Sequence, residues 1–257
     1  MKVLLLAAGY ATRLYPLTEN MPKSLLPLGK KLIIDYIIES IDELDEVTEI
    51  ILISNSKFAD QFTDWANSHK EERESSSKAP ISILNDGTDS PDNMRGAIGD
   101  ILFAMGEKEI NEDICIMAGD NIFTYKLSDM YDFYKKCGAD TLVAIHVPEK
   151  HQLQRLAVAV LSEEEGKEGL VLDMEEKPEE PKSNWGIYAT YFYKKETLPL
   201  FAEYINEGNS PDAPGRFPAW LYKRQPVYAF KANGSCIDIG TLDNYEAICK
   251  DFENKDA

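Results

Sequence analysis

The sequence predicts an α/β fold with a mostly parallel central sheet, helices on both faces and a small antiparallel part. Three observations predict this class. Short apolar runs that end at turn residues, such as residues 3–8 and 114–118, are typical of buried parallel strands. Up to about residue 147, such runs alternate with segments of helical periodicity. Beyond that point, two apolar runs flank the acidic turn SEEEGKEG and predict an antiparallel hairpin.

The first strand is predicted at residues 3–8, because the run is continuous, begins with a β-branched residue and is closed by Gly9. Three prolines between residues 16 and 27 then exclude a long helix. Leucine and isoleucine recur at helical spacing over residues 32–41, which predicts the first helix. The polar segment KEERESSSKA at residues 70–79 has few apolar residues and is predicted to be a surface loop.

The remaining elements rest on the same signals of periodicity and length. The chain is predicted to form a single domain over residues 1–257, since no linker or internal repeat interrupts it. Strands are expected at residues 49–54, 81–84, 114–118, 141–147, 156–161, 170–174 and 186–193, and helices at 58–69, 96–105, 128–137, 196–206 and 241–252.

Composition excludes several classes of function. The net charge of −18 over 257 residues argues against nucleic acid as a partner, because affinity for nucleic acid comes from basic surface. No apolar stretch approaches the roughly 20 residues of a membrane span, so no membrane partner is expected. An N-terminal signal peptide is disfavoured because the apolar run is short and Arg13 follows it closely. The four cysteines are widely spaced, which predicts free thiols and a cytoplasmic location.

The loop after the first strand is the strongest candidate site. A strand that ends in small residues presents backbone N–H groups to a ligand above the sheet, as phosphate-binding loops do. Arg13 and Lys23 add two positive charges: Arg can grip phosphate oxygens in a bidentate way, and Lys acts as a movable point charge. The competing reading treats both residues as ordinary surface charges.

The run Gly9-Tyr10-Ala11-Thr12-Arg13-Leu14, followed by Pro16, Thr18 and Pro22-Lys23, resembles the signature of the sugar nucleotidyltransferases, the NDP-sugar pyrophosphorylases. The glucose-1-phosphate thymidylyltransferases are the most similar subgroup. Ala11 stands where the family pattern Gly-x-Gly-Thr-Arg has its second glycine, and alanine disfavours positive φ, so a slightly different loop backbone is expected. The resemblance implies a Rossmann-like nucleotide-diphospho-sugar transferase fold, with nucleotide binding by Ala8, Gly9, Tyr10, Ala11, Thr12 and Arg13.

The turn-rich segment 85–99, NDGTDSPDNMRGAIG, lies where the family reads the base of the nucleotide. The resemblance therefore implies nucleotide contacts from Asn85, Gly87 and Gly96. The alternative is that the glycines only permit tight turns.

Gly119-Asp120-Asn121 follows the strand predicted at 114–118, and ligands in open α/β sheets collect at the carboxyl ends of strands. An aspartate there can hold Mg²⁺ that also touches phosphate oxygens. The segment resembles the family motif whose aspartate binds the metal, and Cys236-Ile237-Asp238-Ile239-Gly240-Thr241 resembles the late motif that supplies a second carboxylate. The resemblance thus implies a Mg²⁺ site formed by Asp120 and Asp238. Asp120 as a simple turn cap is the alternative.

Glu175-Glu176-Lys177-Pro178 and the run PKSNW at residues 181–185 also match the thymidylyltransferases. There the glutamate accepts from sugar hydroxyls and the lysine contacts the sugar phosphate, which implies sugar-phosphate binding by Asn121, Glu176, Lys177 and Trp185. Tyr191 and Tyr193 are expected to pack within the sheet. The segment 210–224 departs from the thymidylyltransferase pattern and leaves the identity of the sugar open.

The resemblance implies that a sugar 1-phosphate attacks the α-phosphate of a nucleoside triphosphate and releases pyrophosphate, with Arg13, Lys23 and Asp120 as the catalytic residues. Residues 1–125 would form the nucleotide-binding half and residues 126–257 the sugar-phosphate-binding half. A cytidylyltransferase acting on a phosphorylated alcohol such as phosphocholine, a uridylyl- or guanylyltransferase, and a non-catalytic nucleotide-sugar-binding subunit remain as alternatives. The base, the sugar and any homo-oligomer are left open.

Overall fold

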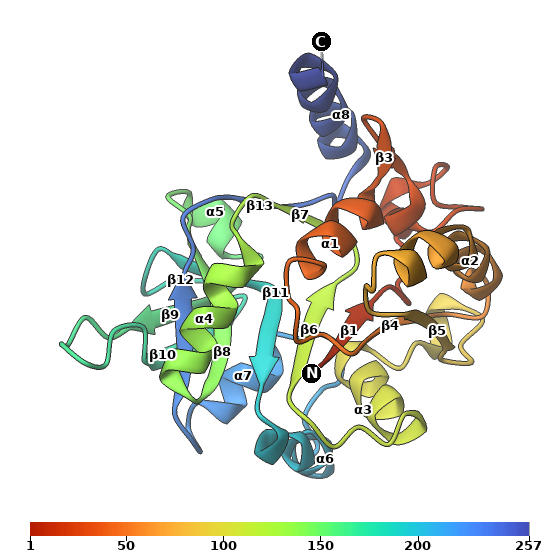
Figure 1. Ribbon diagram of the computed structural model, residues 1–257. Coiled ribbons are helices and arrows are strands. Elements are labelled where there is room, and N and C mark those ends of the chain that lie inside the picture. The colour runs from red at the N-terminus through yellow and green to blue at the C-terminus, as the bar shows by residue number, and fades with distance from the viewer. Residues whose placement is uncertain (257) are drawn as a thin grey trace.

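The computed structural model describes residues 1–256, with the backbone alone for residues 238 and 253–256. Its centre is a nine-stranded sheet in the order β10-β9-β11-β6-β1-β4-β5, in which β8 pairs with both β11 and β12 (Figure 1). The strands of this sheet are β1 (Lys2–Leu6), β4 (Glu49–Ser54), β5 (Ile81–Asn85), β6 (Ile114–Ala118), β8 (Asp140–His146), β9 (Ala157–Leu161), β10 (Val171–Glu176), β11 (Trp185–Tyr193) and β12 (Val227–Lys231).

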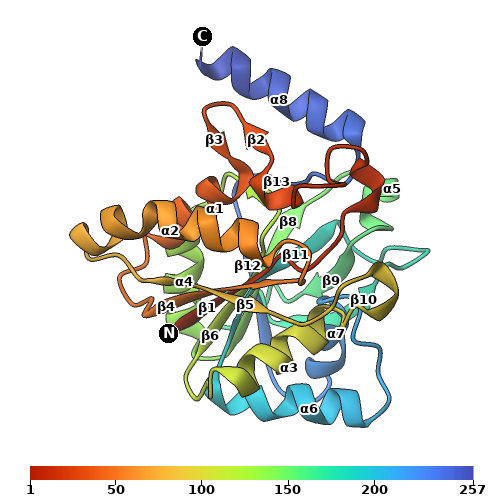
Figure 2. The same cartoon turned by 90° about the vertical axis from the view of Figure 1, so that its right-hand side faces the viewer.

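The parallel part of the sheet is covered on both faces, as its continuous apolar strands require. Successive side chains of β1 point to opposite faces of the sheet. Val3 and Leu5 belong to a buried apolar cluster on one face, and Leu4 belongs to a second cluster on the other face. The first cluster involves α1 (Ile33–Ile41), α2 (Ala59–Ser75) and α4 (Leu127–Cys137). The second involves α3 (Ala97–Glu107), α6 (Leu198–Asn206) and α7 (Arg216–Leu221), and Figure 2 shows α1 and α2 on the opposite side of the sheet from α3 and α6. The predicted α/β class is confirmed.

Strand β11 joins the parallel part to the antiparallel part. It runs antiparallel to β6, β8 and β9, and its pairing with β8 shifts register between Tyr188 and Tyr191. The predicted hairpin forms from β9 and β10, and it extends the central sheet instead of building a layer of its own. Tyr191 and Tyr193 are buried in this sheet, as expected.

Two small antiparallel sheets lie beside the central one, and sequence periodicity did not predict either of them because their strands have only two or three residues. One pairs β7 (Asn121–Phe123) with β13 (Cys236–Asp238), and the other pairs β2 (Pro27–Leu28) with β3 (Lys31–Leu32). The closing helix α8 (Leu242–Asp256) lies next to the β2–β3 hairpin (Figures 1 and 2). The hydroxyl of Tyr245 in this helix donates to the carbonyl of Pro27 at 2.6 Å. A short helix, α5 (Lys150–Leu153), precedes β9. No helix in the described part of the chain has the length and apolar character to cross a bilayer.

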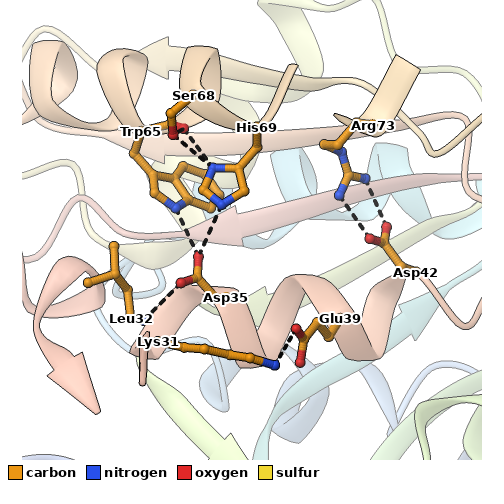
Figure 3. Close-up of polar contacts among 9 residues, drawn as sticks. All are labelled: Lys31, Leu32, Asp35, Glu39, Asp42, Trp65, Ser68, His69 and Arg73. Atoms are coloured by element: carbon orange, nitrogen blue, oxygen red, sulfur yellow. Dashed lines mark hydrogen bonds and ion pairs between the residues drawn. The ribbon is translucent and has the colours of Figure 1, made fainter. Parts of the chain in front are cut away.

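The prediction of a surface loop at residues 70–79 is wrong, because α2 continues to Ser75. Arg73 explains the longer helix. Its guanidinium is buried and donates to both carboxylate oxygens of Asp42, at 2.9 and 2.8 Å (Figure 3). The same guanidinium also donates to the carbonyl of Ala79. A paired, buried arginine holds this end of the helix, although the segment has too few apolar residues to show an amphipathic pattern.

Asp35 connects the other end of α1 to α2. One carboxylate oxygen accepts from the backbone N–H of Leu32 at 2.8 Å, which caps the start of α1. The other accepts from the indole N–H of Trp65 at 3.0 Å (Figure 3). Together, Asp35 and the Arg73–Asp42 pair fix two points of contact between helices on one face of the sheet.

We expect Arg73→Ala to lower the free energy of unfolding by about 3 kcal/mol, since it leaves a partly buried carboxylate without its partner. Urea denaturation followed by circular dichroism measures this change. Lys70→Ala is the matched control, because the Lys70–Glu74 pair on the same helix is exposed and should contribute less than about 0.5 kcal/mol. Equal effects of the two substitutions would contradict the anchoring role of Arg73.

Candidate active site

A cavity of about 570 Å³ opens at the carboxyl ends of β1 and β6. Its size lies within the usual range for sites that hold small molecules. Both parts of the sheet contribute to its wall. Most of the lining residues come from the loop after β1, the short helix 23–25, the segment from the end of β5 to the first turn of α3, the turn after β6, the ends of β9 and β10, the middle of β11 and the segment 212–215.

The loop after β1 is held from two sides. The side-chain amide of Asn55 donates to the carbonyl of Ala8 at 2.8 Å, and the hydroxyl of Thr18 donates to the carbonyl of Ala11 at 2.8 Å. Both side chains are fully buried, so neither bond competes with water. Ala11 adopts φ 48° and ψ 42°, the left-handed conformation that glycine takes most easily. The alanine therefore does not prevent a left-handed turn in this loop, and the Thr18 bond helps to hold it.

The same loop presents unpaired backbone donors. Within the described part of the chain, no group accepts a hydrogen bond from the amides of Gly9, Tyr10 or Ala11. Ala8, Gly9, Ala11 and Arg13 line the cavity, so free N–H groups and a guanidinium occur together at its edge. Such a combination suits the oxygens of a phosphate chain.

Lys23 and Asp120 meet in the cavity wall although 97 residues separate them in the sequence. The ammonium of Lys23 lies 2.8 Å from Asp120 Oδ2, and Lys23 is only 7% exposed. Gly119 brings Asp120 close to the loop after β1, since its N–H donates to the carbonyl of Leu6 at 2.9 Å. A Cβ at Gly119 would lie 3.2 Å from that carbonyl oxygen, so a larger residue would crowd this approach.

Asp238 lies next to this pair along the backbone. Strand β13 places it opposite Asn121, the neighbour of Asp120, but the Asp238 side chain is outside the described residues. Among the described side chains, no three of the histidine, cysteine, aspartate and glutamate type lie together as metal ligands. The Asp120 carboxylate accepts a hydrogen bond from the Lys23 ammonium, so this position already pairs with a positive charge. One or two carboxylates together with phosphate oxygens are the ligands that Mg²⁺ prefers. The Asp120 carboxylate, with the backbone of Asp238 on the neighbouring strand, therefore fits a magnesium site.

Glu176 occupies the part of the wall formed by the antiparallel strands. Burial raises the pKa of its carboxyl group, while Lys177 and Arg216 act in the opposite direction. Gly215 leaves the space for this side chain, because a Cβ there would lie 2.2 Å from Glu176 Oε2. Lys177 has a left-handed backbone (φ 51°), a side chain that is 57% exposed, and an ammonium 4.0 Å from Glu176 Oε1.

Nine of the residues that the sequence predicts as site residues line the cavity, and six others do not. The nine are Ala8, Gly9, Ala11, Arg13, Lys23, Gly96, Asp120, Asn121 and Glu176. The six are Tyr10, Thr12, Asn85, Gly87, Lys177 and Trp185.

Several of the six have visible structural contacts. Asn85 Oδ1 accepts from the Gly87 N–H at 2.9 Å and so shapes the turn after β5. The ring of Trp185 packs edge-on against His146 at 5.6 Å and lies under the Lys231 ammonium. Ligand contacts by these residues stay predictions.

Sequence reasoning missed four charged residues in the wall, namely Asp86, Asp100, Arg155 and Asp212. Asp86 follows β5 directly, so the rule that ligands collect at the carboxyl ends of strands could have found it. Asp100 looks like an ordinary acidic residue in the first turn of a helix. Arg155 and Asp212 lie in connections without a recognisable motif.

The segment around Asp212 closes one side of the cavity by capping α3. The carbonyl of Pro211 accepts from the N–H of Ile98 at 2.9 Å, and that of Asp212 accepts from the N–H of Ala97 at 3.2 Å. Gly96 has φ 76°, and a Cβ there would lie 2.7 Å from the Pro211 oxygen. Gly96 is therefore needed for both its backbone conformation and this close contact.

Comparison with known proteins agrees with this geometry. A family model described as nucleotidyl transferase matches residues 2–255. The bifunctional protein GlmU of Methanocaldococcus jannaschii is 28% identical over 241 residues, covering 93% of this chain and 51% of the relative. A glucose-1-phosphate thymidylyltransferase of Neisseria meningitidis is 32% identical over 204 residues, covering 77% of this chain and 63% of the relative. The chain thus spans about half to two thirds of the length of these relatives.

A solved structure of UDP-glucose pyrophosphorylase complexed with UDP-glucose superimposes with a TM-score of 0.80. The match covers 99% of this chain and 98% of that one at 22% identity, so it shows a common fold.

Proposed function

This chain belongs to the nucleotidyl transferase family, and we propose that it joins a nucleoside triphosphate to a sugar 1-phosphate. The products would be a nucleoside diphosphate sugar and pyrophosphate. One observation carries the proposal: a single cavity holds the Lys23–Asp120 pair beside a loop of free amides, and Glu176 on another part of its wall. Positive groups for a triphosphate and a carboxylate for sugar hydroxyls therefore face the same space.

In the proposed reaction an oxygen of the sugar phosphate forms a bond to the α-phosphorus, and the bond from that phosphorus to the bridging oxygen of the β-phosphate breaks. The electron pair leaves with pyrophosphate. The attacking group has a second pKa of about 6, so it is largely dianionic at neutral pH and needs no general base. In keeping with this, none of the described lining residues is a histidine.

The task left to the protein is alignment of two anions and neutralisation of charge on the leaving group. The amides of the loop after β1 would hold the triphosphate, with Arg13 and Lys23 beside it. Lys177, exposed at the edge of the site, would reach the sugar phosphate, and Glu176 would orient the sugar. Asp120 and Asp238 would hold Mg²⁺, which when bound lowers the negative charge around the phosphates.

This assignment divides the site between two parts of the chain. Residues 1–125 would supply the nucleotide-binding half, and residues 126–257 would supply the sugar-phosphate-binding half. The capping of α3 by Pro211 and Asp212 joins the two halves at the cavity wall.

The test is pyrophosphate release with dTTP, UTP, CTP, GTP and ATP, each combined with a set of sugar 1-phosphates and with phosphocholine. Turnover with any sugar 1-phosphate supports the proposal. Turnover restricted to CTP and phosphocholine would instead identify a cytidylyltransferase acting on a phosphorylated alcohol. Binding of nucleotide sugars without any turnover would identify a non-catalytic subunit.

We expect Glu176→Ala to raise KM for the sugar 1-phosphate by about 10- to 100-fold, the cost of losing hydrogen bonds to a carboxylate. KM for the triphosphate should change little, because Glu176 lies in the antiparallel part of the wall. Glu175→Ala is the control, since the neighbouring side chain is exposed and does not line the cavity. An equal rise in both KM values would argue against a sugar-specific role.

A further inference from the structure

Two polar side chains, Asn55 and Thr18, hold the loop of free amides from inside the protein. The amide of Asn55 donates to the carbonyl of Ala8, and the hydroxyl of Thr18 donates to the carbonyl of Ala11, both at 2.8 Å. Each of the two side chains has an exposed fraction of 0%, and neither lines the cavity. A ligand in the cavity therefore meets the loop and not the residues that hold it.

The bond from Asn55 fixes the direction of the amide that follows Ala8. In a trans peptide unit, such as the one that joins Ala8 to Gly9, the carbonyl and the N–H lie in one plane and point in opposite directions. The Ala8 carbonyl points at the buried amide of Asn55, so the Gly9 N–H points away from it. Gly9 is exposed and lines the cavity, and its N–H has no acceptor among the described residues. The bond thus turns a free donor away from the interior.

The two polar atoms of the Asn55 side chain serve different parts of the molecule. Its Oδ1 accepts from the N–H of Phe58 at 3.2 Å, in the turn that leads into α2. The next residue, Ser56, donates its N–H to the carbonyl of Thr88 at 2.8 Å, which ties this turn to the segment 85–99. The oxygen of Asn55 therefore supports the fold, whereas its nitrogen supports the loop. A suitable substitution can separate the two contacts.

The bond from Thr18 acts on the other end of the loop. Ala11 adopts the left-handed conformation, with φ 48°, which is unfavourable for any residue that has a Cβ. The Thr18 hydroxyl and the N–H of Leu14, at 2.9 Å, both donate to the Ala11 carbonyl and hold the residue in this conformation. Without the hydroxyl, Ala11 can relax toward a commoner conformation, which would turn the neighbouring amides.

We propose that Asn55 and Thr18 are positioning residues of the triphosphate site. By holding the carbonyls of Ala8 and Ala11, they keep the free amides of the loop turned toward the cavity, where phosphate oxygens accept from them. The inference rests on the proposed function. Donors that are fixed before a ligand binds need no ordering on binding, so the loss of either bond should weaken the affinity for a phosphate chain.

Asn55→Ser tests one end of the loop. Serine can still accept from the N–H of Phe58, but its side chain is too short to reach the carbonyl of Ala8. We expect about a tenfold rise in Kd for inorganic triphosphate with Mg²⁺, measured by calorimetry, and in KM for the nucleoside triphosphate. KM for the sugar 1-phosphate should stay within about twofold of wild type. Asn209→Ser is the matched control, because the Asn209 amide also donates to a backbone carbonyl at 2.8 Å, that of Tyr204, away from the cavity.

Thr18→Val tests the other end with little change in shape, since valine replaces only the hydroxyl by a methyl group. The same rise of about tenfold in Kd for inorganic triphosphate is expected. Thr18→Ser keeps the hydroxyl and should hold Kd within about twofold of wild type. Thr63→Val is the matched control, because the Thr63 hydroxyl donates to the carbonyl of Ala59 at 2.8 Å on α2, away from the cavity.

A Kd for inorganic triphosphate within twofold of wild type in both folded variants would overturn the proposal, and an effect in only one of them would reject the role of the other residue. An equal rise in KM for both substrates would mark a structural defect instead. If Asn55→Ser does not fold, the proposal stands or falls with Thr18→Val and its rescue by serine. If the wild-type protein releases no pyrophosphate with any substrate pair, the proposed function fails. Binding of inorganic triphosphate then tests the two residues separately, and a wild type that does not bind it would overturn the positioning role as well.

Discussion

Replacing Lys23 by methionine is expected to lower kcat for pyrophosphate release by about 100- to 1,000-fold, the usual cost of removing one group that stabilises charge in the transition state. Lys23 is 7% exposed and lies in the short helix Lys23–Leu25, so its ammonium acts where water screens it little. Methionine retains the apolar stem of the side chain, and the packing around it should survive. Rapid-quench or coupled pyrophosphate assays at saturating substrates measure the change.

Lys126→Met is the control, because Lys126 is exposed and lies away from the cavity wall. Circular dichroism and thermal melting should place both variants close to the wild type. Asp120 loses a partner in Lys23→Met, but its side chain is 33% exposed and can be hydrated. A kcat within a few-fold of wild type, in a folded variant, would remove Lys23 from the mechanism.

Most of the fold could be predicted because its helices and strands carry the signals that sequence reasoning uses. The strand Glu49–Ser54 has the predicted bounds, since its central residues 50–53 are apolar and both of its faces are buried. Helix α2 was cut short in the prediction because its last turns depend on Arg73 and Asp42, which are 31 residues apart. A long-range ion pair leaves no periodic signal in the sequence.

The candidate site was predictable to the extent that its residues belong to short motifs at the ends of strands. Arg13, Lys23 and Asp120 come from such motifs, and the fold brings all three to one cavity. Asp100 also lines the cavity but could not be found in this way, because an acidic residue in the first turn of a helix is common. Lys177 and Trp185 come from a matching motif, yet they lie outside the wall because a motif fixes residue types and not side-chain directions.

The cavity also explains why residues 210–224 matter despite their lack of a recognised motif. Carbonyls of this segment cap α3, and Gly215 leaves room for Glu176. One segment therefore forms the wall beside Gly96, before α3, and the wall beside Glu176. A change in this segment is expected to alter both of these parts of the wall, which fits its departure from the thymidylyltransferase pattern.

Replacing Asp120 by asparagine is expected to lower kcat for pyrophosphate release by at least about 1,000-fold. The reason is that a bound metal ion stabilises the charge of the transition state by several kcal/mol, and each 1.4 kcal/mol of activation free energy changes the rate by a factor of about ten. Asp120 follows β6 and lies next to the loop of free amides, where the phosphates are proposed to bind. Asparagine keeps the size and one acceptor oxygen, but it lacks the charge that Mg²⁺ and the Lys23 ammonium both require. The substitution should also remove the dependence of triphosphate affinity on Mg²⁺, which calorimetry with and without the ion measures.

The matched control is Asp129→Asn, since Asp129 is an exposed residue in the first turn of α4, outside the cavity. Its kcat and Mg²⁺ dependence should equal those of the wild type. The two measurements on Asp120→Asn separate the proposed roles of this residue. If kcat falls while triphosphate affinity keeps its full Mg²⁺ dependence, Asp120 acts by orienting Lys23, and the metal belongs to other ligands. If neither quantity changes in a folded variant, Asp120 is only a partner of Lys23 in the fold, and the proposed metal site at the ends of β6 and β13 is wrong.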